Sequence, residues 1–203
     1  WKSFQLDPTI PEVPKYQDNM YMFVADRKGF SYEQSKKMHQ DLIQYAKSVG
    51  LEYNFDKALV TNSLKGHRLI QFAKTKGLGE KAEERLFYAY FTQGKNLSDV
   101  ATLIKLGKEI SLTETEVNEA LTNSLYVQKV ESDSKEAQTL GARGVPFFVI
   151  KTPIYFIFLV LGLNVLTTKT SSLLHQKIKL VFGKETLMFK QCAYNSNINK
   201  IFK

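Results

Sequence analysis

A proline stands directly before a run of four apolar residues late in the chain. Residues 140–150 read LGARGVPFFVI, so Val145 and Pro146 precede Phe-Phe-Val-Ile. A short apolar run rich in aromatic and β-branched residues predicts a buried strand. A proline at its start loses one ladder hydrogen bond, which a trans proline at a strand start or a cis peptide bond can accommodate. The segment therefore predicts a loop and a strand, with both forms of the Val145–Pro146 bond open.

Helices fill most of the chain before this loop. Ser31 and Gln34 form a capping-box pattern, which predicts a helix that ends near Val49. Apolar residues at helical spacing and glycines at the ends predict five more helices. These cover residues 63–76, 80–93, 98–109, a stretch that begins after Thr113, and 125–139. Short helices joined by brief turns are typical of a compact helical subdomain.

The segment before the helices has a different pattern. Residues 1–6 are typical of the end of a strand, which Asp7 and Pro8 would terminate. The order of strand, helical block and strand fits helices inserted into an α/β sheet better than a free-standing helical bundle. Because two strands alone do not make a stable sheet, we expect the complete fold to have more strands.

The net charge of +8 is concentrated at one end of the sequence. Residues 1–150 carry 20 Lys and Arg against 19 Asp and Glu, whereas residues 151–203 carry 8 Lys and a single Glu. Nucleic-acid binding needs a coherent basic face, and residues 1–150 are balanced in charge. We therefore expect no nucleic-acid partner.

The character of the sequence changes after Ile150. Residues 152–168 carry no charge, and a stretch of about 17 uncharged residues reaches the lower limit for a membrane span. It contains Pro153 and Asn164, so we expect no membrane insertion and interpret it as out-of-frame sequence.

Cysteine and histidine are too sparse for several kinds of site. The single cysteine, Cys192, excludes an internal disulfide, a Cys-x-x-Cys pair and a multi-cysteine metal site within these residues. No helix N-terminus is predicted beside Cys192 to activate its thiol, so we expect no catalytic role for it. His39 and His175 have no partners at ligand spacing, and we expect no metal.

The loop segment GARGVPFFVI resembles the cis-proline segment of the thioredoxin superfamily. More narrowly, it resembles the DsbA-like branch called FrnE-type, which is close to the 2-hydroxychromene-2-carboxylate isomerases and kappa-class glutathione transferases. Three more segments are similar to that branch and occur in the same order along residues 1–150. They are WKSFQLDP, GLEYNFDKALVTNSLKGHRLIQFAK and ERLFYAYFTQGKNLSDVATLIKLG.

The resemblance implies an α/β thioredoxin-like fold with a large inserted helical subdomain. Residues 1–10 would be the second strand of the core, 11–139 the helical subdomain, and 140–150 the cis-proline loop and third strand. Residues 151–203 would be a tail outside the family pattern. The fold would be incomplete here, with the first strand and the closing hairpin missing.

The two departures from the family pattern suggest a truncated product. In this family the first strand leads to a Cys-x-x-Cys pair at a helix N-terminus, where the helix dipole lowers the pKa of the first thiol. This sequence contains no such pair, and a reading-frame change near Lys151 would explain the divergent tail. Because this branch is often cytosolic, we favour a cytoplasmic location.

The resemblance implies a thiol–disulfide oxidoreductase without a catalytic residue in these 203 residues. Its partner would be a thiol or disulfide substrate, either a protein or a small molecule, and no cofactor is expected. Val145 and Pro146 would clamp the substrate backbone. Asn62, His67 and Arg68 would lie near the substrate, although an N-cap asparagine, a hydrogen-bonded histidine and a surface arginine explain them equally well.

Two alternatives remain open. The first is a glutathione-dependent isomerase or transferase of the same fold, in which a single serine or cysteine replaces the pair. The second is a non-catalytic product of a pseudogene, or a module that binds partners through a cleft.

Overall fold

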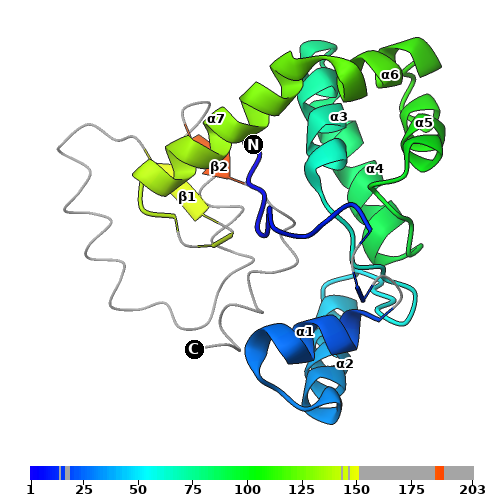
Figure 1. Ribbon diagram of the computed structural model, residues 1–203, viewed down its shortest axis with the longest axis vertical. Coiled ribbons are helices and arrows are strands. Elements are labelled where there is room, and N and C mark those ends of the chain that lie inside the picture. The colour runs from blue at the N-terminus through cyan, green and yellow to red at the C-terminus, as the bar shows by residue number, and fades with distance from the viewer. Residues whose placement is uncertain (14, 17–18, 143, 146, 151–185, 190–203) are drawn as a thin grey trace.

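The computed structural model describes residues 1–13, 15–16, 19–142, 144–145, 147–150 and 186–189 (Figure 1). In this part of the chain, seven helices precede a pair of short strands. The helices are α1 (Met20–Lys28), α2 (Tyr32–Ser48), α3 (Leu64–Thr75), α4 (Gly79–Phe91), α5 (Val100–Glu109), α6 (Glu114–Thr122) and α7 (Ser124–Thr139). The strands are β1 (Phe147–Ile150) and β2 (Thr186–Phe189).

The predicted caps are present at the helix ends. Ser31 and Gln34 form the expected capping box of α2, and Thr113 and Glu116 form another at the start of α6. Six of the seven helices lie where the sequence predicted them. The exception is α1, which lies before Ser31, where no helix was predicted.

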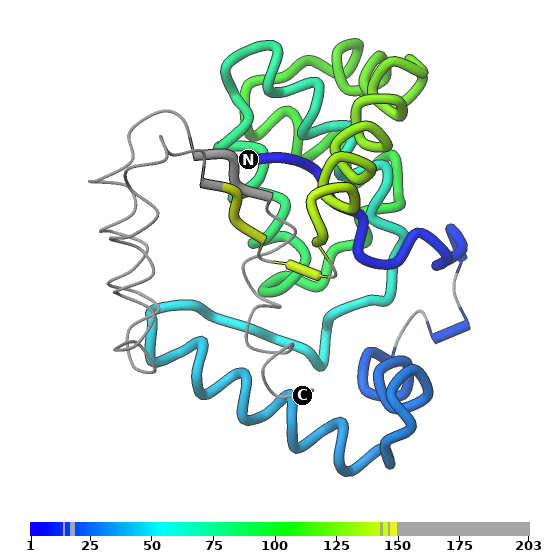
Figure 2. Tube along the Cα trace, turned by 90° about the vertical axis from the view of Figure 1, so that its left-hand side faces the viewer, coloured from blue at the N-terminus to red at the C-terminus, as the bar shows by residue number. Residues whose placement is uncertain are grey.

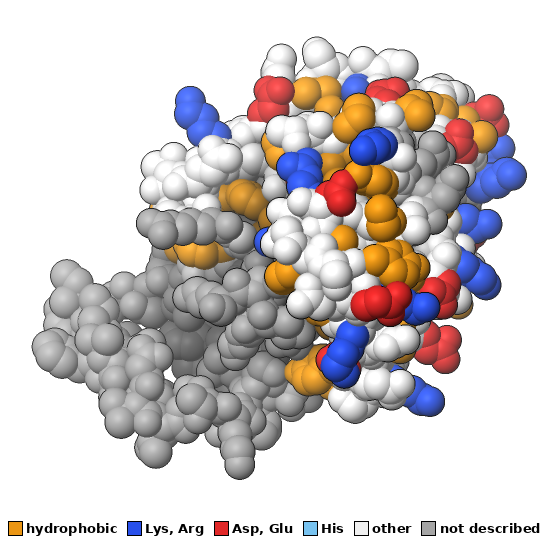
Figure 3. Space-filling model, turned by 60° about the horizontal axis from the view of Figure 1, so that its bottom comes forward, with side chains coloured by type: hydrophobic (Ala, Val, Ile, Leu, Met, Phe, Trp, Pro, Cys, Tyr) orange, Lys and Arg blue, Asp and Glu red, His pale blue; other side chains and the backbone are white. Residues whose placement is uncertain are grey.

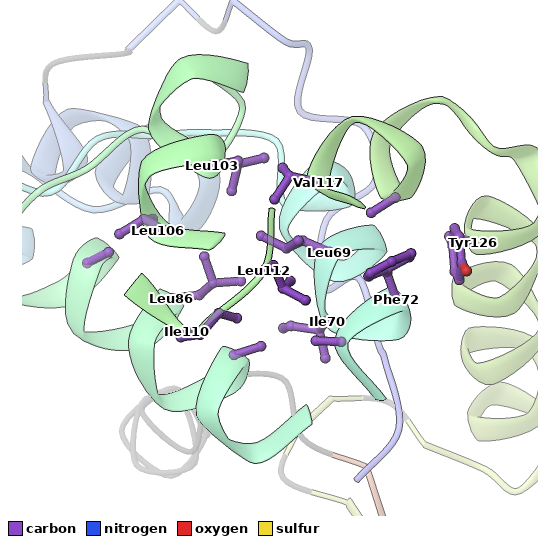
Figure 4. Close-up of a cluster of buried hydrophobic side chains, with 14 residues drawn as sticks. Leu69, Ile70, Phe72, Leu86, Leu103, Leu106, Ile110, Leu112, Val117 and Tyr126 are labelled. Atoms are coloured by element: carbon purple, nitrogen blue, oxygen red, sulfur yellow. The ribbon is translucent and has the colours of Figure 1, made fainter. Parts of the chain in front are cut away.

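The main hydrophobic core is built around α3. Leu69, Phe72 and Ala73 on this helix are almost completely buried, and they pack with side chains from α4, α5, α6 and α7 (Figure 4). Leu103 and Val117, from α5 and α6, are also fully buried in this cluster. Helices α3 to α7 therefore share one core, as expected for a helical subdomain.

Helices α1 and α2 form a hairpin that packs against the rest through aromatic residues. Figures 1 and 2 show this hairpin set apart from α3 to α7. Its link is a second cluster in which Tyr21 and Leu42 meet Phe55 from the following loop and Phe91 from α4. The rings of Phe55 and Phe91 meet edge to face, with centroids 6.3 Å apart.

The sheet differs from the expectation in two respects. Strand β1 pairs antiparallel with β2, with Phe147 opposite Phe189, so the tail supplies a strand where we expected the closing hairpin to be missing. Residues 1–10 hold an isolated bridge at Lys2 and no continuous strand. A strand needs a neighbour paired along its length, and the described part of this segment has only that single bridge position.

Charge and apolar character are mixed on the surface. Figure 3 shows Lys, Arg, Asp and Glu side chains on the same face of the helical part, with hydrophobic side chains between them. Among the described residues, no helix has both the length and the apolar character needed to cross a bilayer. The uncharged stretch 152–168 lies outside those residues.

Candidate functional site

The N-terminal segment is held against α3 and α7 by a buried polar cluster. The backbone N–H of Ser3 donates to the Asp133 carboxylate at 2.8 Å, and Gln71 Nε2 donates to Ser3 Oγ at 2.9 Å and to Asp133 at 2.7 Å. The ammonium of Lys74 donates to the carbonyl of Trp1 at 2.9 Å. This cluster was not predicted, because Ser3 and Asp133 are distant in the chain; the only local signal is that Gln71 and Lys74 share one side of α3 by their spacing.

His67 lies one turn before Gln71 on the same helix. Its side chain is buried, with 8% exposed, and within the described residues no hydrogen bond is made by its ring. The pKa of His67 is lowered to about 4, mainly by burial; the nearby charge of Lys74 acts in the same direction, and Asp133 acts in the opposite direction. The imidazole is therefore neutral at pH 7, with one nitrogen that donates and one that accepts.

Asn62 is committed to structural hydrogen bonds at the start of α3. Its Oδ1 accepts from the backbone N–H of Leu64 at 2.9 Å and from Gln5 Nε2 at 3.1 Å. Its Nδ2 donates to the carbonyl of Ile10. The N-cap of α3 is Ser63, so Asn62 lies one position before the cap, and its bonds fasten the N-terminal segment to the start of the helix. A substrate-binding role for Asn62 stays a prediction.

Arg68 holds the C-terminal end of α6. Its Nε donates to the carbonyl of Ala120, and one terminal nitrogen donates to the carbonyl of Asn123, each at 3.2 Å. A cation at a helix C-terminus satisfies carbonyls without helical partners and interacts favourably with the helix dipole. The structure therefore gives Arg68 structural partners away from the N-terminal segment, and its predicted role at a substrate site remains untested.

The loop before β1 is anchored through one side chain. Val145 is 1% exposed and packs with Phe4, Ala137 and Ala142. Because this side chain is buried, any contact of Val145 with a substrate would come from its main chain. Pro146 lies outside the described residues, so its peptide geometry and the proposed clamp stay predictions.

A cavity of about 660 Å³ lies between the α1–α2 hairpin and the α3–α4 pair. One wall comes from residues 6–10 and from one side of α1, and His67 and Ile70 of α3 line another. Most lining side chains are apolar. Of the five predicted site residues, His67 alone appears among the described lining residues, so the structure does not gather the five into one site.

A second histidine, His39, lines the same cavity from α2. Its Nδ1 lies 2.7 Å from the carbonyl of Ser35, which can only accept, so Nδ1 carries the proton and Nε2 is an acceptor. The ring meets Phe55 edge to face with centroids 4.7 Å apart, and burial lowers the pKa of His39. No binding role for His39 was predictable, because its cavity partners are distant in the chain.

Metal-ligand geometry is absent from the described part of the structure. There, no group of three or more His, Cys, Asp or Glu side chains lies close enough to hold an ion. Cys192 lies outside those residues.

The comparisons with known proteins identify the family. The family model of the DSBA-like thioredoxin domain matches residues 1–165. The chain belongs to this family. The DSBA-like match continues past Ile150, where we expected the family pattern to end, and so it includes the first part of the tail.

The DSBA-like assignment is supported by one solved structure. A probable DsbA oxidoreductase from Streptomyces coelicolor is 28% identical and superposes with a TM-score of 0.67. The alignment covers 72% of this chain and 62% of the other, so this DSBA-like chain spans less than two thirds of that protein. No curated protein matches the sequence. The family and the structural match together confirm the thioredoxin-like fold with inserted helices.

Proposed function

We propose that this chain is part of a DsbA-like thiol–disulfide oxidoreductase of the FrnE-type branch. The observation that carries the proposal is the DSBA-like match over residues 1–165. The similarity to a probable DsbA oxidoreductase supports it, because 28% identity extends over most of this chain. The order of the four family-like segments supports the narrower branch.

The chemistry requires two thiols. A low-pKa thiolate attacks one sulfur of a substrate disulfide, a mixed disulfide forms, and the other substrate sulfur leaves as a thiolate. A second enzyme cysteine then attacks the mixed disulfide, which releases the reduced substrate and leaves the enzyme pair oxidised. The 203 residues carry one cysteine, so the reactive pair would have to lie outside them.

The loop before β1 would position the substrate. Val145 and Pro146 would form a loop whose main chain pairs with an extended thiol or disulfide substrate. The burial of Val145 against Phe4 supports this role, since it fixes the loop beside the N-terminal segment. No nucleic-acid partner is proposed, because residues 1–150 are balanced in charge.

The glutathione-dependent alternative has less support from the site geometry. That alternative places Asn62, His67 and Arg68 near the thiol substrate, and of these three only His67 lines the cavity. Asn62 and Arg68 are the two that count against it. Both side chains have structural partners instead, at the start of α3 and at the end of α6. Occupied hydrogen-bonding groups are poor candidates for ligand contacts, because the ligand would have to break an existing bond.

Thiol exchange can be measured on two proteins. One is this 203-residue chain, and the other is the longest product of its gene; each is assayed for dithiothreitol-driven reduction of a disulfide-bonded protein. We expect turnover by the longer product alone, and Cys192→Ser in that product should leave the rate within about twofold, since Cys192 is not the proposed nucleophile. Turnover by the 203 residues that Cys192→Ser abolishes would overturn the proposal.

A further inference from the structure

We propose that the cavity between the α1–α2 hairpin and the α3–α4 pair binds a neutral, mainly apolar small molecule that donates a hydrogen bond to His67. The cavity volume, about 660 Å³, lies in the range of pockets that enclose small organic ligands. The inference concerns ligand binding alone, and it does not depend on the proposed thiol exchange.

Apolar side chains in the walls are only partly covered by protein. Met20, Phe23 and Val24 occupy one side of α1 at spacings of three and four residues, and all three are half-buried. Across the cavity, Phe87 and Tyr90 of α4 are also half-buried. A helix side of this kind normally packs on a core. Here it borders the cavity, so an apolar ligand would remove further apolar surface from water.

His67 supplies the polar contact. Its side chain is more than nine-tenths buried and lines the cavity, and its ring makes no hydrogen bond to any other described residue. Because the ring borders the open space of the cavity, a ligand with a matching group can form a hydrogen bond with it there. A hydroxyl on the ligand would donate to the accepting nitrogen of this ring.

The histidines favour a donor over a second acceptor. His39 offers only Nε2 as an acceptor, since its Nδ1 proton is used by the carbonyl of Ser35. His67 is neutral because burial lowers its pKa, and so it too presents an accepting nitrogen. An uncharged hydroxyl or N–H group suits both rings.

The charges at the cavity favour a neutral ligand. Arg27 lines it but pairs with the Asp7 carboxylate, and the hydroxyl of Thr9 accepts from the same guanidinium at 3.0 Å. Lys28, the remaining charged residue on the described wall, is exposed to solvent. An anionic ligand that entered the cavity would lose its hydration and would find no buried cation placed to pair with it. This loss of hydration carries a large free-energy cost.

Three related probes test the proposal on the wild-type chain. They are 4-butylphenol, 4-butylanisole, which lacks the donor, and 4-butylbenzoate, which is anionic. Calorimetric titration at pH 7.5 should show the phenol binding at least about tenfold more tightly than either analogue, because only the phenol can donate to the accepting nitrogen of His67 or His39 without burying a charge. Equal binding of phenol and anisole, tighter binding of the benzoate, or no binding of the phenol would each overturn the proposal.

Variants then locate the hydrogen bond. His67→Leu should reduce the preference for the phenol over the anisole to within about twofold, because the apolar walls remain while the acceptor is lost. Tyr88→Leu is the matched control, since Tyr88 is an exposed residue of α4 that does not line this cavity. This control should retain the full preference. A folded His67→Leu protein that still prefers the phenol would refute the assignment of His67, and the wild-type comparison stands even if this variant fails to fold.

Discussion

At the residue scale, His67 shows how burial sets a protonation state. The ring lies between the polar cluster of Gln71 and Asp133 and the apolar cavity. Removal from water disfavours its charged form, and the neighbouring Lys74 ammonium adds to that effect. Folding therefore requires a neutral His67, and this requirement links the stability of the chain to pH.

We expect the free energy of unfolding to fall as the pH decreases from 6.5 to 4. The pKa of His67 is about 4 in the folded chain and 6.5 when exposed, so the unfolded state takes up the proton first. The stabilisation is complete above pH 6.5 and is lost as the pH falls through this window. It amounts to about 3 kcal/mol. Urea unfolding at pH 7.5, 5.5 and 4.5 measures it.

His67→Leu is the control for this linkage. The variant should unfold with a shallower pH dependence between pH 6.5 and 4, and His39, whose pKa is also lowered by burial, should account for part of the remainder. An unchanged slope in the variant would contradict the neutral state of His67 in the folded chain.

The roles of Asn62 and Arg68 could be predicted only in part from the sequence. The start of α3 and an asparagine near it were predictable, because capping patterns are local. The partners that decide the roles, Ile10 and Ala120, lie more than 50 positions away along the chain. Neither spacing nor propensity reports such pairings, which is why the sequence left structural and substrate-binding interpretations open for both residues.

At the element scale, most helices were predictable because their signals are local. The capping box of Ser31 and the glycine after Val49 mark α2 in the sequence itself. Helix α1 was missed because its apolar residues are divided between two sides, with Tyr21 and Ala25 buried and Phe23 and Val24 at the cavity. Its ends are nevertheless marked by Asn19, which accepts from Met22 N, and by Gly29, which adopts a left-handed φ of 69°.

Two glycines inside helices should respond in opposite ways to alanine. A Cβ at Gly66 would lie 3.7 Å from Leu97 Cδ1, an ordinary contact, so Gly66→Ala should stabilise α3 by up to about 1 kcal/mol through helix propensity. A Cβ at Gly107 would overlap Cγ2 of Val117, which is fully buried. Gly107→Ala should therefore destabilise the chain by about 1–3 kcal/mol, because α5 and α6 are forced apart.

Thermal and urea unfolding of the two variants check this pair. Each serves as the control for the other, since both substitutions place the same methyl group inside a helix. Stabilisation by Gly107→Ala would mean that α5 and α6 do not approach as closely as the structure shows.

At the scale of the whole molecule, two hydrophobic clusters divide the helices into a larger and a smaller packing unit. The cluster around Leu69 draws on helices α3 to α7, whereas α1 and α2 pack mainly on each other and reach the rest through Phe55 and Phe91. Hydrogen exchange should be at least about tenfold faster in the α1–α2 hairpin than in α3. Mass spectrometry of peptic fragments measures this. Equal protection of both parts would contradict the division.

The sheet was the least predictable part of the fold. Strand β1 was predictable from the local apolar run Phe147–Ile150. Its partner β2 lies more than 30 residues further along, in the tail that we expected to fall outside the family pattern. Pairing between strands so far apart leaves no periodic pattern in the sequence of either strand that would identify its partner. The family match through residue 165 shows that part of this tail has the DSBA-like pattern.

The proposed thiol–disulfide exchange needs a cysteine pair that these residues do not contain, and the full-length transcript of the gene would reveal whether such a pair is encoded. Read in all three frames, the transcript should encode a strand with Cys-x-x-Cys before Trp1. A transcript that encodes no such cysteine pair in any frame would contradict the account.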